Sequence, residues 1–278
     1  TSAADGTVAI GFSSLTALTE GGKNVAIGYE SGKLIQTGER NTILGHQAGI
    51  ATVDVDSTVI IGNYAGASVM TNAASGTVAI GKGSLSSLTE GAGNTALGFQ
   101  SGQFTTTGLN NTFVGYLAGQ GITGAKLTQN SNTAVGKSAG LLLQGAADGN
   151  TLIGASAGDV ITTGTLNTLL GKSSDPSSAT GTNQSVIGAG TTGVADNSVT
   201  LGNASVTRVN MSSDGAAVMY ADGTINTSDR RFKENIEDTD LGLSFINSLR
   251  PVKYNFIEDK HDGKTKYGII AQEVVEVL

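Results

Sequence analysis

The sequence predicts a mainly β protein: a glycine-rich parallel β-solenoid, then a short β stalk and a small α+β unit. Three observations support this fold class. Gly accounts for 41 of the 278 residues, roughly twice its ordinary share. A five-residue unit that ends in Gly recurs about every 17 residues. Near residue 227 the composition changes, because Gly becomes rare and charged residues become frequent.

The repeated unit reads Asn/Thr-Thr/Val-x-Ile/Leu/Val-Gly, as at 24–28 and 41–45. A longer duplication lies over it, since 6–11 recurs as 76–81. A period near 17 is too short for a two-helix repeat. We therefore expect about twelve stacked coils, each with about two short strands. The closing glycines stand at 11, 28, 45, 62, 81, 98, 115, 136, 154, 171, 188 and 202.

The predicted core is thin, because each coil offers only one to three aliphatic side chains. Coils of this kind expose apolar residues on a second face, which neighbouring chains would bury. An Asn stands four residues before the repeat Gly in seven of twelve repeats. Stacked Asn side chains can form a hydrogen-bonded ladder, so we interpret this Asn as structural rather than catalytic.

Composition also argues against several classes of function. The net charge is −7 without a basic stripe, which disfavours nucleic-acid binding. No apolar run approaches the ~20 residues of a membrane span. The absence of Cys and the presence of only two His residues predict no metal site and no cofactor. The chain begins at Thr1 rather than Met and ends at Leu278 within an apolar periodic stretch, so we expect a fragment or a processed piece.

The composition shift predicts three parts: a repetitive solenoid at 1–202, a β stalk and linker at 203–227, and a C-terminal domain at 228–278. Residues 1–227 hold 8 Lys/Arg and 13 Asp/Glu, whereas the much shorter 228–278 holds 8 and 10. In that last part we expect a helix capped by Thr239-Asp240 and ended by Pro251. A strand at 252–256, a turn at 262–263, a strand at 265–270 and a helix from 271 follow.

Three ordered blocks in 228–278 resemble the S74 peptidase family, the self-cleaving intramolecular chaperones at the C-terminus of phage tail fibres and tailspikes. These blocks are 228–236 (Ser-Asp-Arg-Arg-Phe-Lys-Glu-Asn-Ile), 249–254 (Leu-Arg-Pro-Val-Lys-Tyr) and 267–274 (Tyr-Gly-Ile-Ile-Ala-Gln-Glu-Val). The family domain normally continues beyond the point where this chain ends. More loosely, the repeats resemble those of tail fibres and the β-roll heads of trimeric adhesins.

The resemblance implies that Ser228 is the nucleophile, Lys233 the general base, and Thr227–Ser228 the bond that is cut. A Ser hydroxyl needs a nearby base, and Lys serves as one only when its pKa falls well below 10.4. Two neighbouring cations, Arg230 and Arg231, would help to lower that pKa. Five residues separate the Ser from the Lys, which one continuous helix would place about 140° apart. We therefore expect Ser228 in a turn or an extended segment.

The alternative interpretation makes Ser228 and Asp229 a helix cap and leaves the Lys solvated. Arg250, Gln272 and Glu273 are either packing or interchain contacts or supporting parts of the catalytic site.

On the solenoid, aromatic residues follow the repeat Gly. An exposed row of these rings would contact sugars of a bacterial surface glycan through Tyr29, Phe99 and Tyr116, whereas an internal aromatic ladder is the interpretation that we prefer. Asp54 and Asp56 could bind calcium, although a solvated loop explains them better. The insertion at 121–131 and the loop at 173–185 are further candidates for a binding surface.

Together, the repeats and the C-terminal blocks predict a homotrimeric tail-fibre protein of a virion that acts outside the cell. Its partners would be a bacterial glycan or other host receptor and further tail proteins. The C-terminal domain would set the register of the coils and then leave by single-turnover self-cleavage. The alternatives are a structural spacer without receptor binding and a polysaccharide-depolymerising tailspike.

Overall fold

The computed structural model describes residues 5–209, 242–254, 265–270 and 272–274. The chain divides into two compact units, Thr1–Asn210 and Met211–Leu278, and each is described here by itself. The predicted cleavage site lies outside the described residues, with all of its members: Thr227, Ser228, Asp229, Arg230, Arg231 and Lys233.

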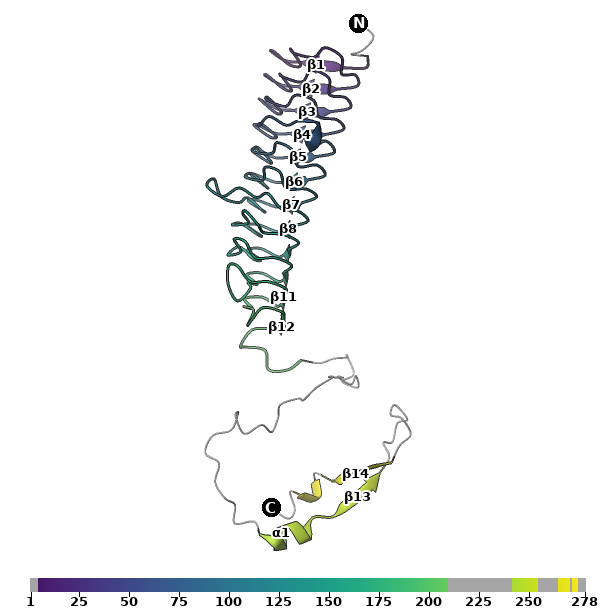
Figure 1. Ribbon diagram of the computed structural model, residues 1–278, viewed down its shortest axis with the longest axis vertical. Coiled ribbons are helices and arrows are strands. Elements are labelled where there is room, and N and C mark those ends of the chain that lie inside the picture. Colours follow the sequence, from purple (N-terminus) through teal and green to yellow (C-terminus); the bar gives the residue numbers. More distant parts are fainter. Residues whose placement is uncertain (1–4, 210–241, 255–264, 271, 275–278) are drawn as a thin grey trace. The chain divides into compact units, whose positions relative to one another are not determined.

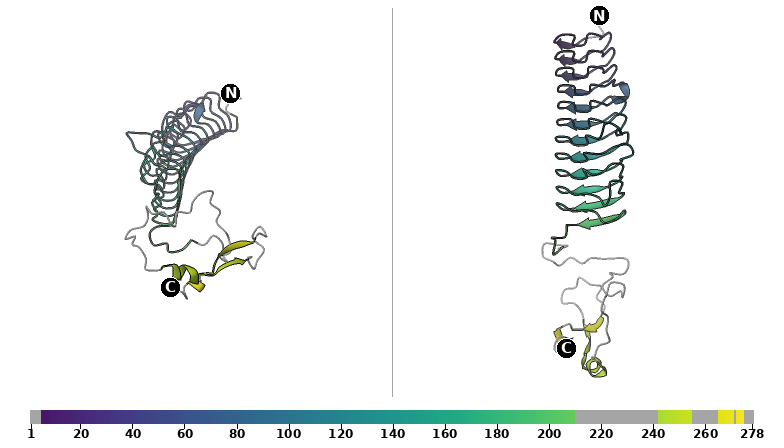
Figure 2. Two further views of the ribbon diagram at one scale, coloured as in Figure 1. Left: turned by 60° about the horizontal axis from the view of Figure 1, so that its bottom comes forward. Right: turned by 90° about the vertical axis from the view of Figure 1, so that its left-hand side faces the viewer.

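The first unit is a parallel β-solenoid of about eleven turns, as the sequence predicts (Figures 1 and 2). Its strands form one sheet in which each strand pairs with the next along the chain. These strands are β1 (Val8–Ile10), β2 (Val25–Ile27), β3 (Thr42–Leu44), β4 (Val59–Ile61), β5 (Val78–Ile80), β6 (Thr95–Leu97), β7 (Thr112–Val114), β8 (Thr133–Val135), β9 (Thr151–Ile153), β10 (Thr168–Leu170), β11 (Gln184–Ile187) and β12 (Ser198–Leu201).

The expectation of about two strands per coil is wrong, because each coil contributes one strand to this sheet. The rest of each coil consists of turns, with a few isolated bridges such as Thr165 to Thr182. Non-glycine residues such as Glu30 and Gln47 adopt positive φ just after the repeat Gly, at 53° and 54°. This left-handed backbone turns the chain sharply, so the second stretch does not continue as a regular strand.

The strand residues alternate between the core and the outside. The middle residue of a strand faces inward and is buried, as Ala26, Ile43, Ile60, Phe113 and Leu152 show. The last residue of each strand, which directly precedes the repeat Gly, faces outward and is always aliphatic. We call these last residues the aliphatic row: Ile10, Ile27, Leu44, Ile61, Ile80, Leu97, Val114, Val135, Ile153, Leu170, Ile187 and Leu201.

The repeat glycines stack directly on one another at the end of the sheet strands. From Gly11 to Gly188 their φ values lie between +131° and +144°, a region that L side chains rarely adopt. A Cβ on Gly98 would overlap the carbonyl group of Gly115 in the next coil. Only Gly therefore permits this close approach of one backbone to the next.

The repeated Asn forms the predicted ladder. In the later coils the side-chain oxygen of each Asn accepts hydrogen bonds from the next, through Asn94, Asn111, Asn132, Asn150 and Asn167. Each side-chain amide also donates to a backbone carbonyl, as Asn111 does to Gln129 at 3.1 Å. All five are buried, so every rung satisfies polar groups that would otherwise be costly to bury.

Threonine replaces Asn in two coils in the middle of the array. Thr58 still donates to the oxygen of Asn41 at 2.7 Å, whereas the hydroxyl of Thr77 donates to Ala74 within its own coil. The 3₁₀ turn Asn72–Ala74 occupies the longer coil at this point. The ladder therefore consists of two separate runs.

The described part of the second unit contains α1 (Leu243–Ser248), β13 (Pro251–Tyr254) and β14 (Lys266–Ile269). The two strands pair antiparallel, with Pro251 opposite Ile269. Residues 272–274 begin a further helical turn. The predicted order of helix, strand, strand and helix is confirmed, but α1 begins after Gly242 rather than after Thr239-Asp240, and the predicted turn at 262–263 lies outside the described residues. Within 203–209, the described part of the proposed stalk, the chain makes a turn and forms no strand.

Candidate functional site

The C-terminal unit brings Arg250 and Glu273 together. Arg250 stands directly before β13, and Glu273 lies in the helical turn that follows β14, so the hairpin carries both. The Nε of Arg250 donates to Oε2 of Glu273 at 3.1 Å, and a second guanidinium nitrogen donates to Oε1. This two-pronged bond holds the pKa of Glu273 below its ordinary value and raises that of Arg250.

This pairing favours one of the two interpretations of Arg250 and Glu273. A carboxylate whose pKa is lowered by a guanidinium is a weaker base, so the pair suits packing better than general-base catalysis. The other sequence-predicted supporting residue of this region, Gln272, is exposed. The catalytic roles of Ser228 and Lys233 remain predictions from the family resemblance.

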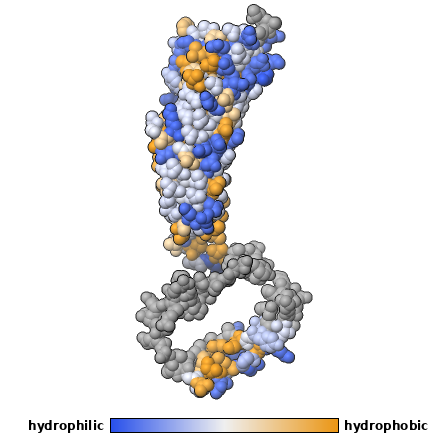
Figure 3. Space-filling view, in the orientation of Figure 1, coloured by the Kyte–Doolittle hydropathy of each residue, from blue (hydrophilic) through white to orange (hydrophobic). Residues whose placement is uncertain are grey.

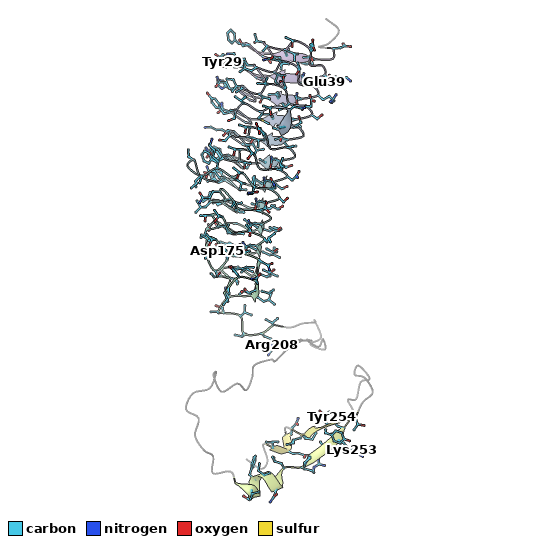
Figure 4. The ribbon with its side chains drawn as sticks, in the orientation of Figure 1. Tyr29, Glu39, Asp175, Arg208, Lys253 and Tyr254 are labelled. Atoms are coloured by element: carbon cyan, nitrogen blue, oxygen red, sulfur yellow. The ribbon has the colours of Figure 1, made fainter. Side chains whose placement is uncertain are left out.

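The hairpin also forms a small hollow lined by Lys253, Tyr254, Thr265 and Tyr267 (Figure 4 labels the first two). Three of these four residues, Lys253, Tyr254 and Tyr267, come from two of the three blocks that resemble the S74 family.

The solenoid places the predicted aromatic residues on its surface. Tyr29 and Tyr116 are 45% and 50% exposed, and Phe99 is partly buried. Phe99 and Tyr116 stack with ring centroids 5.2 Å apart and planes inclined by 10°. Tyr29 stacks on Phe12 at 5.4 Å. The preferred expectation of an internal aromatic ladder is therefore wrong: the ladder exists, but it lies outside the core.

Two members of this surface ladder were missed by sequence reasoning. His46 stacks on Tyr29 at 5.2 Å, and Tyr64 meets the edge of His46 at 5.8 Å. His46 follows a repeat Gly directly, so its place in the repeat could have indicated it. Tyr64 stands one position later in its coil.

Polar residues surround the Tyr29 stack. Lys33 and Gln47 both donate to the carboxylate of Glu30 at 2.7 Å, and these bonds hold the pKa of Glu30 below its ordinary value. Figure 4 shows Tyr29 at one edge of the solenoid and Glu39 at the opposite edge.

Each of the two predicted loops is held by contacts with its own coil or a neighbouring one. In the insertion at 121–131, Ile122 and Ala125 form a tight bridge, and Leu127 returns to the core. In the loop at 173–185, Gln184 accepts from the backbone N–H of Ser177 and donates to Asp196. Whether either loop binds a partner stays a prediction.

The carboxylates proposed for calcium take part in contacts between coils. Asp54 accepts from the hydroxyl of Thr37 at 2.8 Å, and Asp56 accepts from the backbone N–H of Glu39 at 2.8 Å. Across the described ranges, no three His, Asp or Glu side chains form a group that could hold a metal ion.

One acidic residue has an unusual environment. Burial, aided by the nearby carboxylate of Asp159, raises the pKa of Asp175 to about 6. One carboxylate oxygen of Asp175 is buried without a hydrogen-bond partner in the described part of the chain.

Comparison with known proteins identifies the C-terminal unit. Residues 228–278 match the Peptidase S74 family, described as the chaperone of endosialidase. Neither a curated protein nor a solved structure shows a significant match to the chain. The match covers only this C-terminal segment of the chain, and a β-solenoid followed by a segment similar to the S74 family fits a phage tail fibre or tailspike. No helix in the described part of the chain is long and apolar enough to span a membrane.

Proposed function

We propose that this chain is the subunit of a homotrimeric phage tail fibre that attaches the virion to its host. Its S74 domain directs assembly and is then released by cleavage between Thr227 and Ser228. The S74 match at 228–278, C-terminal to a solenoid of similar coils, is the observation that carries this proposal. The proposal includes a division of the chain into a solenoid at 1–202, a stalk at 203–227 and a chaperone domain at 228–278. The last strand of the solenoid, β12, ends at Leu201, which supports the first boundary.

The aliphatic row supports a homotrimer. It runs the length of the sheet on its outer face, and members such as Leu97, Ile153 and Leu170 are exposed in a single chain. Figure 3 shows apolar surface along one edge of the lower coils, near the positions that Figure 1 labels β11 and β12. Contiguous apolar surface of this kind is rare on monomers and is typical of subunit interfaces.

The repeat chemistry gives a reason for a chaperone. The Asn bonds and the Gly contacts are nearly the same in every coil, so three chains shifted by one coil would make almost the same contacts. Registers that are nearly equal in energy are prone to slip. A trimeric C-terminal domain would align the chains before the coils pack, and its removal would make the assembly kinetically irreversible.

The proposed cleavage needs only one Ser and one base. Lys233 takes the proton of the Ser228 hydroxyl, and the oxygen attacks the carbonyl carbon of Thr227. Lys233 then passes this proton to the amide nitrogen, which leaves as the amine of Ser228 while an ester forms, and water hydrolyses that ester. The Lys must be neutral to act, which requires burial or neighbouring cations.

The test compares the parent chain with Ser228→Ala and Lys233→Ala by intact mass spectrometry. We expect the parent to give fragments 1–227 and 228–278, and both variants to stay whole. A matched pair, Leu170→Lys and Leu166→Lys, tests the interface by light scattering. Both leucines belong to one coil and are 47% and 57% exposed, but only Leu170 is in the aliphatic row.

We expect Leu170→Lys to shift the trimer toward monomer and Leu166→Lys to leave it trimeric. An uncut parent would refute the cleavage step. A monomeric parent, or a trimer that tolerates Leu170→Lys as well as Leu166→Lys, would refute the proposed assembly.

A further inference from the structure

The residues that directly follow the repeat glycines form a second column on the surface, which we call the post-glycine column. Backbone hydrogen bonds keep its members in line: Leu117 donates to the carbonyl of Phe99 at 2.9 Å, and Ser138 donates to that of Tyr116 at 2.8 Å. Successive members are therefore about 4.8 Å apart. The column consists of Phe12, Tyr29, His46, Asn63, Lys82, Phe99, Tyr116, Lys137, Ala155, Lys172, Ala189 and Asn203.

The charge of this column is opposite to that of the whole chain. The chain has a net charge of −7, yet the column contains three lysines and no Asp or Glu. Only 8 Lys and Arg residues occur in 1–227, so more than a third of them stand in this one column. The column is therefore a local positive line on an acidic protein, and it favours an anionic ligand.

Lysines and aromatic rings come together in four successive coils. We call Lys82, Phe99, Tyr116 and Lys137 the lysine–aromatic strip. The ammonium of Lys82 lies over the Phe99 ring, 5.9 Å from its centroid, and Tyr116 stacks on the other side of Phe99. Both lysines are exposed. Three coil spacings separate them, about 14 Å in all, so the strip is long enough to contact several units of a polymer.

Amide side chains lie beside the strip. Gln100, which follows Phe99, accepts from Gln120 at 3.3 Å, and Gln120 also donates to Gln103 at 2.9 Å. The amides of this cluster offer both donors and acceptors, as does the phenol of Tyr116. Such groups suit a ligand with many hydroxyl groups.

The stacking argues against a nucleic acid. A base binds an aromatic side chain by lying on an open ring face. Here Phe99 is covered by Tyr116 on one side and by the Lys82 ammonium on the other. A polyphosphate would also be repelled by the net negative charge of the chain. A sugar polymer with occasional carboxylates avoids both problems, because its charge is sparse and its hydroxyls bond in the plane of the surface.

We propose that the lysine–aromatic strip binds an acidic polysaccharide, with Lys82 and Lys137 contacting its carboxylates and Tyr116 and the Gln cluster contacting its hydroxyls. This proposal rests on the host-attachment part of the proposed function and names the class of receptor.

The experiment measures binding of the full chain to an array of bacterial capsular and lipopolysaccharide glycans of known composition, with polygalacturonate and neutral dextran as defined probes. We expect the bound glycans to carry carboxylated sugars and dextran to stay unbound. Affinity for polygalacturonate should fall with rising salt, because the ammonium–carboxylate contacts are exposed. The double variant Lys82→Gln/Lys137→Gln should weaken it about tenfold or more, and Tyr116→Ala should weaken it severalfold.

Lys172→Gln is the matched control, because Lys172 belongs to the same column but has Ala155 and Ala189 as its neighbours. It should leave the affinity within about twofold. Binding to neutral glycans only, no binding at all, or equal losses in Lys172→Gln and the double variant would overturn the proposal. So would tight binding to poly(dT). Light scattering on the same samples separates this failure from that of the proposed function: a trimer that binds no acidic glycan refutes only the strip.

Discussion

Asn111 donates two hydrogen bonds to the side-chain oxygen of Asn94, one from its backbone N–H at 2.9 Å and one from its amide at 3.1 Å. Its own oxygen accepts the equivalent pair from Asn132. Each Asn thus joins two coils and fixes their register. The bond is buried, so neither partner can turn to water instead.

Asn111→Ala should therefore destabilise the solenoid by about 1–3 kcal/mol, since it leaves buried groups of two coils without partners. Chemical denaturation of the full chain, followed by circular dichroism, measures this loss. Asn63→Ala is the control, because the amide of Asn63 contacts Nδ1 of His46 in the neighbouring coil at 3.2 Å but on the exposed surface. Its cost should stay within about 0.5 kcal/mol. Equal losses in the two variants would show that the ladder contributes nothing beyond an ordinary surface contact.

Gly98→Ala should be more damaging than its single methyl group suggests. The φ of Gly98 is +141°, and the added Cβ would overlap the carbonyl of Gly115. Backbone strain and overpacking together should cost more than about 2 kcal/mol. Gly124→Ala should be close to neutral, because no atom lies within 4 Å of its Cβ position. The unfolding midpoints of both variants test this, and a tolerated Gly98→Ala would contradict the close stacking of the coils.

Asp175 should make the solenoid more stable as the pH falls from 7 toward 4.5. Its pKa is raised to about 6 by burial and by Asp159, whereas an unfolded chain has an ordinary value near 3.8. The folded state therefore binds the proton more tightly between these two values, and its stability is lost as the pH rises through 6. Asp175→Asn should raise the melting temperature at pH 7.5 and flatten this pH dependence. Glu90→Gln, a change at an exposed carboxylate, serves as the control, and a pH profile unchanged by Asp175→Asn would contradict the assignment.

Glu273→Gln should leave self-cleavage nearly unchanged. Glu273 is paired with Arg250, which lowers the pKa of Glu273 and makes it a poor proton carrier. The pair is exposed, so its loss should cost less than about 1 kcal/mol. The extent of cleavage with time, measured by mass spectrometry, should match the parent within about twofold, whereas Lys233→Ala should not cleave. A loss of cleavage in Glu273→Gln at unchanged melting temperature would assign this residue a role in the reaction.

Much of the solenoid could be predicted because two residue types, Gly and Asn, mark each repeat independently. The spacing of glycines such as Gly28 and Gly45 gives the period, and the buried Asn24 and Asn41 give the register. The absence of a second strand in each coil could not be predicted in this way. Residues such as Glu30 adopt positive φ there, and neither their type nor their neighbours indicate a left-handed turn.

The side on which the rings lie could not be read from the sequence for a different reason. Large aliphatic residues normally face the core, so Ile27 would be placed inside and Ala26 outside. The structure reverses this: Ala26 is buried and Ile27 is exposed. Tyr29, which directly follows the repeat Gly of this coil, is exposed as well. The missing information was which face of each strand lies outward, and neither the spacing nor the residue types of the repeat give it.

The stacked glycines have a consequence for how the length of this protein can change. Every coil presents the same backbone contact to the next, so a coil from one part of the array fits against a coil from another. The duplication of 6–11 as 76–81 adds 70 residues, which corresponds to four coils. A gain or loss of that segment by recombination between repeats would lengthen or shorten the solenoid by about 19 Å without creating a new kind of junction. The reach of the molecule can thus evolve in whole steps, independently of the residues that it displays.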